Sequence, residues 1–260
     1  MNVVGFPVVL ASLSLVIIAL GLARWLRLGI ERELFVAAVR AAIQLSAVGV
    51  LFAAIFGSSR ASLWAWTWVA FMVVNATRVV LRRAEHAIDH LAWAAGLAIA
   101  GSAAISISVT FGFGVLDYNP VALVVIAGIT IGNAVPASVL AAKQSISLCR
   151  DHVGDLDAVL GLGFDRRQAV RFMAPRAARA AMVPQIERTR VVGLIALPGA
   201  MTGLLLAGVD PVDAVAVQLL VMYLVLGTVA VCVVTVVTTV TSAAVTEDLR
   251  AAEWTRMANK

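Results

Sequence analysis

The sequence predicts an all-α membrane protein that crosses the bilayer seven times. Of its 260 residues, 62% are hydrophobic and only 13% are charged, and the mean hydropathy is +0.97. A water-soluble domain carries about 25% charged residues. The apolar stretches are long and continuous, without the alternation of an outer-membrane β-barrel. Helices are therefore expected, because lipid cannot satisfy unpaired backbone polar groups.

Seven stretches are long enough for a helical span, which needs about 20 apolar residues. They are Val3–Ala23, Leu34–Phe56, Leu63–Leu81, Leu91–Phe113, Val121–Ala142, Val191–Val209 and roughly Val215–Thr241. The first has no basic segment before it and no small-residue cleavage site, which favours a retained span over a signal peptide.

Positive charge is strongly one-sided relative to these spans. All but one of the 20 lysines and arginines fall on one side, and Arg60 alone falls on the other. The positive-inside rule then predicts an N-terminus outside, a C-terminus in the cytoplasm and a location in the cytoplasmic membrane. Because topology explains the net charge of +5, we expect no nucleic-acid partner. We expect one transmembrane domain over residues 1–260.

The only sizeable polar segment is the predicted cytoplasmic loop, residues 144–190. Apolar positions from Leu156 onward favour a short amphipathic helix, with Asp155 or Asp151 as its N-cap. Gly161 and Gly163 would end this helix.

A second, basic helix is expected in the same loop over Arg166–Ala180, capped by Asp165 and kinked by Pro175. A short helix, a glycine turn and a basic helix form a suitable docking surface. The alternative is an amphipathic helix that lies on the membrane surface without a partner.

The loop is similar to the coupling loop through which ABC permeases contact their ATPase subunit. Asp157-Ala158-Val159 is followed after three residues by Gly163, and Met173 and Pro175 stand near the end of the pattern. The candidate coupling residues are Asp155, Asp157, Ala158, Gly161, Gly163, Arg166 and Arg167.

Beyond this loop, nearly the whole chain resembles the FetB-like family of ABC permeases, which also includes plant aluminium-tolerance half-transporters. The resemblance lies in Arg27–Leu45, in Gly-Asn-Ala-Val-Pro at Gly132–Pro136, and in Val191–Val215. The Leu-Pro-Gly-Ala-Met-Thr-Gly string, Leu197–Gly203, is its most specific piece.

The resemblance implies a permease subunit that works with a separate ATP-binding subunit, as a homodimer with two ATPases. ATP would bind to the partner, and this chain would need no cofactor of its own. The resemblance also implies export, linked to iron in bacteria or to nucleotide sugars in plants.

Polar residues inside the predicted spans are the candidates for a substrate path, since buried polar groups in lipid are costly. Counting along the helices at about 1.5 Å per residue places them near the middle of the bilayer. The candidates are Gln44, Asn133, Pro136, Pro198, Met201 and Thr202. The alternative is that these residues only join helices by hydrogen bonds and close packing.

Several chemistries are disfavoured by what the sequence lacks. It contains no GxxxxGK[ST] phosphate-binding loop and no span with paired acids or a histidine, so we expect neither ATP hydrolysis nor another enzymatic activity on this chain. His86 and His90 have a spacing that metal pairs use, but with Asp89 they give no convincing metal site. A secondary transporter or channel that acts without ATP is the alternative function.

Overall fold

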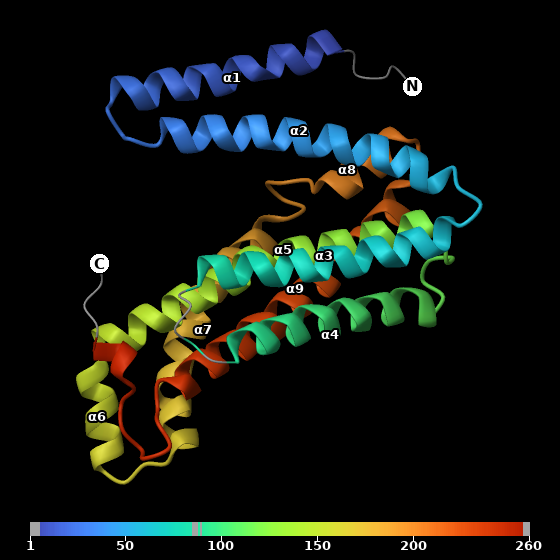
Figure 1. The fold of residues 1–260 in the computed structure, drawn as a ribbon. Helices are drawn as coiled ribbons and strands as arrows, with labels where there is room; N and C mark the ends of the chain where they lie inside the picture. Colours follow the sequence, from blue (N-terminus) through green and yellow to red (C-terminus); the bar gives the residue numbers. More distant parts are fainter. Residues whose placement is uncertain (1–5, 85–87, 89, 257–260) are drawn as a thin grey trace. The chain divides into compact units, whose positions relative to one another are not determined.

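The structure, a computed structural model, describes residues 6–84, 88 and 90–256. Within these residues it is almost entirely helical, apart from two isolated β-bridges (Figure 1). The chain forms two compact units that meet in sequence at Ala61 and Ser62. The expectation of one domain over residues 1–260 stays a prediction.

The first unit is a helical hairpin of α1 (Phe6–Trp25) and α2 (Glu31–Phe56). Arg27 and Gly29 both adopt positive φ angles, 53° and 73°, in the turn between the two helices. Along α2 the apolar side chains are largely exposed, and the most apolar stretch of this helix has none of its residues buried. Such a surface suits lipid or a further protein partner.

The second unit is built around two long parallel helices, α5 (Pro120–Asp151) and α9 (Pro211–Ala243), which pack along each other. The helix α4 (Leu91–Gly112) packs against both. On α3 (Ala61–Arg83), Ala65 and Val80 are fully buried. The core is rich in alanine and valine, which allow the close helix approach that is typical of membrane proteins.

Buried hydroxyl groups join α4 to α9 inside this core. The Ser106 and Thr228 hydroxyls are 3.1 Å apart, and the Ser102 hydroxyl lies 3.5 Å from the Cys232 sulfur. Ser102 and Ser106 also donate to carbonyl oxygens one turn earlier in their own helix. These polar groups are satisfied within the protein, as an apolar surrounding demands.

The prediction of a multi-pass helical membrane protein is confirmed. Among the described residues, five helices are long and apolar enough to cross a membrane: α2, α3, α4, α5 and α9. The first predicted span forms α1, of which Leu13–Trp25 is a shorter apolar helix, and its first residues lie outside the described part. The number of seven spans and the orientation of the termini stay predictions.

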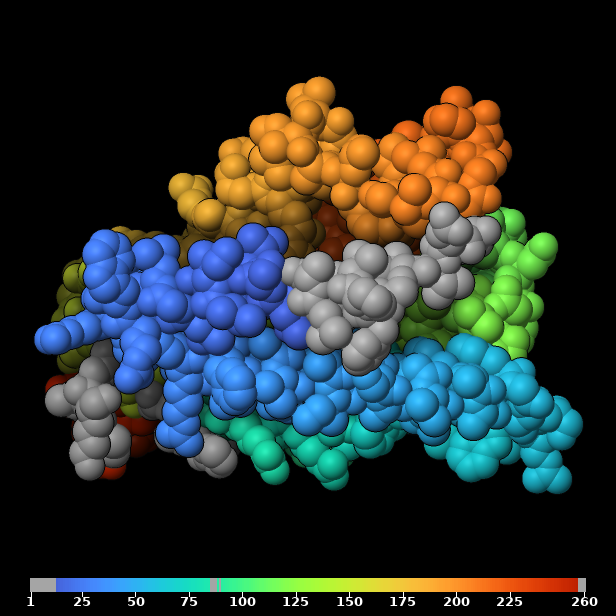
Figure 2. Space-filling view, turned by 90° about the horizontal axis from the view of Figure 1, so that it is seen from above, coloured from blue at the N-terminus to red at the C-terminus, as the bar shows by residue number. Residues whose placement is uncertain are grey.

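The sixth predicted span, Val191–Val209, is wrong as a single helix. The structure breaks after Val191, and α8 (Gly199–Leu206) follows only after an irregular segment. Gly193 has a φ of +87°, and Pro198 precedes α8 instead of kinking a helix. The segment is exposed, as the orange atoms at the surface show (Figure 2), with Leu194 93% exposed.

The polar loop 144–190 also differs from the prediction. Its first residues continue α5, which runs to Asp151, and the short helix α6 (Val153–Gly161) follows. His152 precedes α6, so neither Asp155 nor Asp151 is its N-cap. The glycine break is confirmed, because α6 ends at Gly161 and Gly163 has a φ of +86°.

The second helix of the loop, α7 (Arg166–Val191), is longer than predicted. It packs against α5 and runs antiparallel along α9 (Figure 1). Four residues spaced one turn apart form its buried stripe: Ala169, Met173, Ala177 and Ala181. Pro175 and Pro184 both lie inside this continuous helix.

The start of α7 is fixed by a reciprocal capping box. Asp165 Oδ1 accepts a hydrogen bond from the Gln168 backbone N–H at 2.7 Å, and Gln168 Oε1 accepts one from the Asp165 backbone N–H at 2.8 Å. The predicted N-cap is therefore confirmed.

Asp165→Ala is expected to lower the free energy of unfolding by about 1 kcal/mol, the usual loss for an N-cap. Thermal unfolding of the purified protein in detergent would measure it. Asp151→Ala removes a carboxylate that caps no helix start and serves as the control. An equal loss of stability in both variants would contradict the capping role.

The C-terminal segment folds back over the ends of α5 and α9. The 3-10 helix η1 (Glu253–Arg256) places Arg256 Nη2 2.8 Å from Asp157 Oδ2 on α6. Trp254 Nε1 donates to the Ala243 carbonyl at 3.2 Å, and Arg150 Nε donates to the Trp254 carbonyl at 3.3 Å. The segment thereby holds α6 near the ends of the long helices.

Candidate functional site: a polar cavity and a basic pocket

A cavity of about 310 Å³ lies between α5, the end of α7, the irregular segment before α8, and α9. Its polar side chains come from three helices, and its walls are otherwise apolar. The polar lining residues are Asn133, Gln185, Arg188, Thr189 and Gln218.

The contact that closes one wall of the cavity joins Arg188 on α7 to Asn133 on α5. Arg188 Nη1 donates to Asn133 Oδ1 at 3.0 Å, and Asn133 Nδ2 donates to the Ile129 carbonyl at 2.7 Å. The Asn133 amide oxygen therefore accepts one hydrogen bond and the amide nitrogen donates one, as an amide side chain can. Arg188 keeps further N–H donors, because one guanidinium carries five.

The cavity lies deep in the apolar part of the second unit. Asn133 follows the first residue of α5, Pro120, by 13 positions, which is about 20 Å along the helix. The hydrocarbon core of a bilayer is about 30 Å thick, so Asn133 and the Arg188 guanidinium lie within it if α5 spans the membrane.

Three charged side chains at this level are exposed on the surface of the chain. Arg188 is exposed, and beside it Arg190 Nη1 pairs with Glu187 Oε1 at 2.7 Å. Charged groups at such depth face water-filled cavities or protein, not lipid. This face of α7 is therefore unsuited to contact acyl chains.

The most buried polar member of the lining is Gln218 on α9, which is 6% exposed. Its Oε1 atom is buried and has no hydrogen-bond partner within the described part of the chain. An unmatched buried acceptor usually costs about 1–3 kcal/mol. A bound water, an ion or a catalytic role commonly accounts for such an acceptor.

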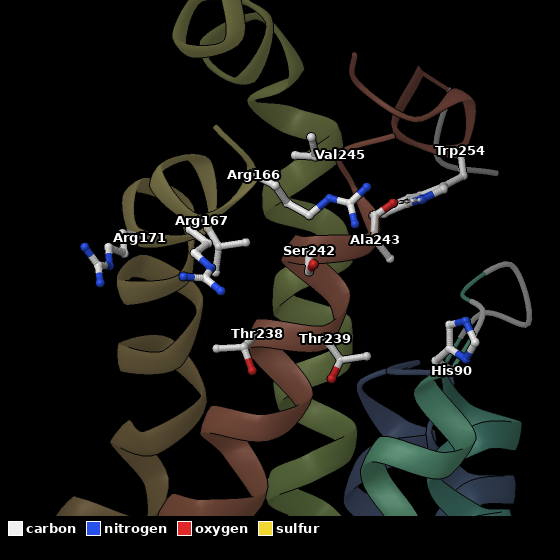
Figure 3. A pocket seen from close by; sticks show the side chains of 11 residues that line it. His90, Arg166, Arg167, Arg171, Thr238, Thr239, Ser242, Ala243, Val245 and Trp254 are labelled. Atoms are coloured by element: carbon white, nitrogen blue, oxygen red, sulfur yellow. Dashed lines mark hydrogen bonds between the residues drawn. The ribbon is translucent and has the colours of Figure 1, made fainter. Parts of the chain in front are cut away.

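A second, basic pocket lies where α7 begins and α9 ends, with a volume of about 870 Å³. Figure 3 shows the Arg166 side chain of α7 pointing towards the end of α9, whereas Arg171 points away from it; Arg167 lines the same pocket. Hydroxyl groups of Thr238, Thr239 and Ser242 line the opposite wall. No described side chain makes an ion pair with Arg166 or Arg167, so the pocket can accept a negatively charged group.

The candidate coupling residues lie on α6, in the turn after it and at the start of α7. Asp157 is bound to Arg256, and Asp155 lies 3.3 Å from His152 Nδ1 and 3.6 Å from Arg176 Nη1. Ala158, Gly161 and Gly163 are exposed. Two large apolar side chains stand in the same turn, with Leu162 77% and Phe164 38% exposed.

The predicted path residues are only partly brought together. Asn133 and Pro198 line the cavity. Pro136 is exposed on α5, and Met201 and Thr202 lie on α8, with the Thr202 hydroxyl donating to the Pro198 carbonyl at 3.1 Å. None of these last three lines the cavity. Gln44 lies exposed on α2 in the first unit, and its membership of the path stays a prediction.

Sequence reasoning missed the charged and amide residues of the cavity, above all Arg188 and Gln218. Arg188 had been assigned to a cytoplasmic loop because its segment is too charged for a hydropathy search. The usable signal was the run of small residues at four-residue spacing in α7, which is typical of a helix packed between others.

No metal centre is apparent in the part of the chain that the structure describes. No group of three or more His, Cys, Asp or Glu side chains there could hold a metal ion. His90 lines the basic pocket, whereas His86 and Asp89 lie outside the described residues.

Comparisons with known proteins agree with the resemblance seen in the sequence. The chain is 31% identical to the rice UPF0014 membrane protein STAR2 over 224 residues, 86% of this chain and 78% of the relative. It is 31% identical to the Escherichia coli probable iron export permease protein FetB over 225 residues, 84% of this chain and 83% of the relative. It is 30% identical to the Arabidopsis thaliana protein ALUMINUM SENSITIVE 3 over 217 residues, 84% of this chain and 79% of the relative.

No solved structure matches the chain. The model of the uncharacterised protein family UPF0014 matches residues 7–244, and this multi-pass helical membrane protein therefore belongs to that family.

Proposed function

We propose that the chain is the permease subunit of an ATP-driven ABC transporter in the cytoplasmic membrane. The observation that carries the proposal is α7, which links the cytoplasmic turn at Gly163 to the deep cavity at Arg188 in one continuous helix. A movement imposed at the turn would therefore reach the cavity directly.

The sidedness of the second unit supports this arrangement. Arg82 and Arg83 at the end of α3, Arg150 at the end of α5, and the start of α7 carry the positive charge. Asp210 and Asp213 stand at the opposite end, where α9 begins. In the proposed orientation the basic ends face the cytoplasm and the C-terminus lies there as well.

The surface offered to an ATPase subunit is the turn between α6 and α7. Exposed Leu162 and Phe164 would fill an apolar groove on that subunit, and Arg166 and Arg167 would meet its acidic groups. Buried apolar anchors with a charged rim are typical of specific interfaces. Arg256 holds Asp157, and thereby α6, in place for this contact.

A homodimer fits the charges that the chain exposes at the depth of the bilayer. In a single copy, Glu187, Arg188 and Arg190 would meet acyl chains. A second copy would cover this face or enclose water against it, in line with ABC motors that act as ATPase pairs. Export, and a link to iron, are proposed by analogy with the relative FetB, a probable iron export permease protein.

The test is ATP-dependent solute movement in proteoliposomes that contain this chain and a candidate ABC ATP-binding subunit from the same organism. We expect radiolabelled iron to accumulate when ATP is added outside, and not with a non-hydrolysable ATP analogue. The alternative is a secondary transporter or channel. Accumulation driven by an ion gradient, with this chain alone and without ATP, would establish that alternative and contradict the proposal.

A further inference from the structure

We infer that the solute which passes the deep cavity carries net negative charge together with a hydrogen-bond donor, as a hydroxycarboxylate or its metal complex does. This conclusion rests on the proposed function, because it assumes that the permease moves its solute past Asn133, Arg188 and Gln218. Iron, if it is the cargo, would then travel as an anionic complex and not as a bare cation.

The charge of the cavity is the first reason. Arg188 is permanently protonated, and its guanidinium stands at the wall of the cavity. Arg190 and Glu187 neutralise each other at 2.7 Å, so the excess charge at this level is the positive charge of Arg188. A bare cation in a surrounding of low dielectric would be repelled, whereas a carboxylate or phosphate would be attracted.

The second reason is the chemistry of the lining. Iron and other hard or borderline cations bind carboxylates, imidazoles and thiolates. The described lining contains no Asp, Glu, His or Cys side chain, and its one sulfur is the Met222 thioether, a soft ligand that suits copper(I) better than iron. The described lining of this cavity therefore supplies no cage for a free iron ion.

The hydrogen-bonding groups define the complementary shape. Arg188 offers N–H donors beyond the one that Asn133 Oδ1 accepts. Gln218 lines another wall of the same cavity, and its Oε1 atom is buried and unpartnered, so a turn of this side chain towards the cavity would present a free acceptor to a solute. A solute that presents an anionic oxygen to Arg188 and a hydroxyl to Gln218 would satisfy both.

Calorimetric titration of the purified chain in detergent tests this directly, without the ATPase subunit. The probes are citrate, ferric citrate, inorganic phosphate and, under anaerobic conditions, ferrous chloride. We expect citrate or ferric citrate to bind and ferrous chloride not to bind. Binding of citrate alone would identify a free organic anion, and binding only of ferric citrate would identify the metal complex.

Arg188→Gln is expected to weaken this binding at least about tenfold, since a charge-assisted hydrogen bond is lost. Arg188→Lys keeps the charge and should retain part of the affinity. Arg179→Gln, on an exposed position of the same helix outside the cavity, is the matched control and should bind as the wild type does. Size-exclusion profiles show whether each variant folds.

Three results would overturn the inference: ferrous ion binding in place of citrate, unchanged citrate binding by Arg188→Gln, or no binding of any anionic probe to the wild-type chain. Failure of the proposed function is distinguishable, because it appears in the proteoliposome assay as absence of ATP-driven movement. A complex that pumps ferrous ion with ATP would keep the proposed function and refute the anionic solute.

Discussion

Reversing the charge at Arg166 and Arg167 together is expected to remove most of the ATPase subunit that co-purifies with the permease. Both side chains line the basic pocket and have no described acidic partner within the chain, so they are available to acidic groups of another protein. Two glutamates there would repel those groups and leave them unpaired at the interface. Affinity purification from detergent, quantified as the molar ratio of the two subunits, measures the effect.

The matched control is Arg179→Glu, which reverses a charge on the same helix, away from the pocket. It should leave the subunit ratio unchanged. A loss of the same size in the control would show that general charge, and not the pocket, governs assembly. An unchanged ratio in the double variant, with a folded permease, would contradict a docking role for Arg166 and Arg167.

The membrane spans that could be predicted from sequence are those in which apolar length alone decides the structure. The helices α2, α3, α4, α5 and α9 each match a predicted span, because each contains an apolar stretch long enough to cross a bilayer. The Asp165 cap was also predictable, because a carboxylate just before a helix typically accepts a hydrogen bond from a backbone N–H of the first turn.

The prediction failed where tertiary contacts outweigh composition. Val191–Val209 is apolar enough for a span, but Gly193 and Pro198 interrupt its backbone. The arginine-rich segment before it was predicted to hold a basic helix over Arg166–Ala180 in a cytoplasmic loop, yet that helix continues to Val191 and packs through a stripe of buried residues against α5 and α9. Hydropathy counts side chains without regard to the face on which they stand, so it could not show that this charged helix has one face that packs against other helices.

The cavity was missed because hydropathy identifies only one of the two residues that meet in its wall. Asn133 was identified because a polar side chain in an apolar span is conspicuous, whereas its partner Arg188 is one of several arginines in a charged segment. A long-range contact such as the one between Arg188 and Asn133 has no signature at either residue alone. The path residues on α8 were predicted from a helix that the structure does not form.

Gln218→Leu is expected to raise the stability of the protein and to lower its transport activity. Both effects are expected because the Gln218 Oε1 atom is buried without a hydrogen-bond partner. Leucine is close in size and removes a buried oxygen without a partner, so the free energy of unfolding should rise by about 1 kcal/mol. For a chain of this size that is about 2–4 °C in Tm. ATP-dependent accumulation in proteoliposomes should nevertheless fall by about tenfold, the factor that corresponds to about 1.4 kcal/mol for a lost contact to the solute.

Ser145→Ala is the matched control for this variant. Ser145 on α5 is fully buried, its hydroxyl also has no partner in the described residues, and it does not line the cavity. It should gain stability in the same way and transport normally. If Gln218→Leu also transports normally, the orphaned oxygen is only a packing defect. If both variants lose transport, added rigidity in itself slows the cycle, and Gln218 has no special role. Only loss confined to Gln218→Leu places a solute contact at that oxygen, because the two substitutions differ in their position relative to the cavity and not in their effect on the core.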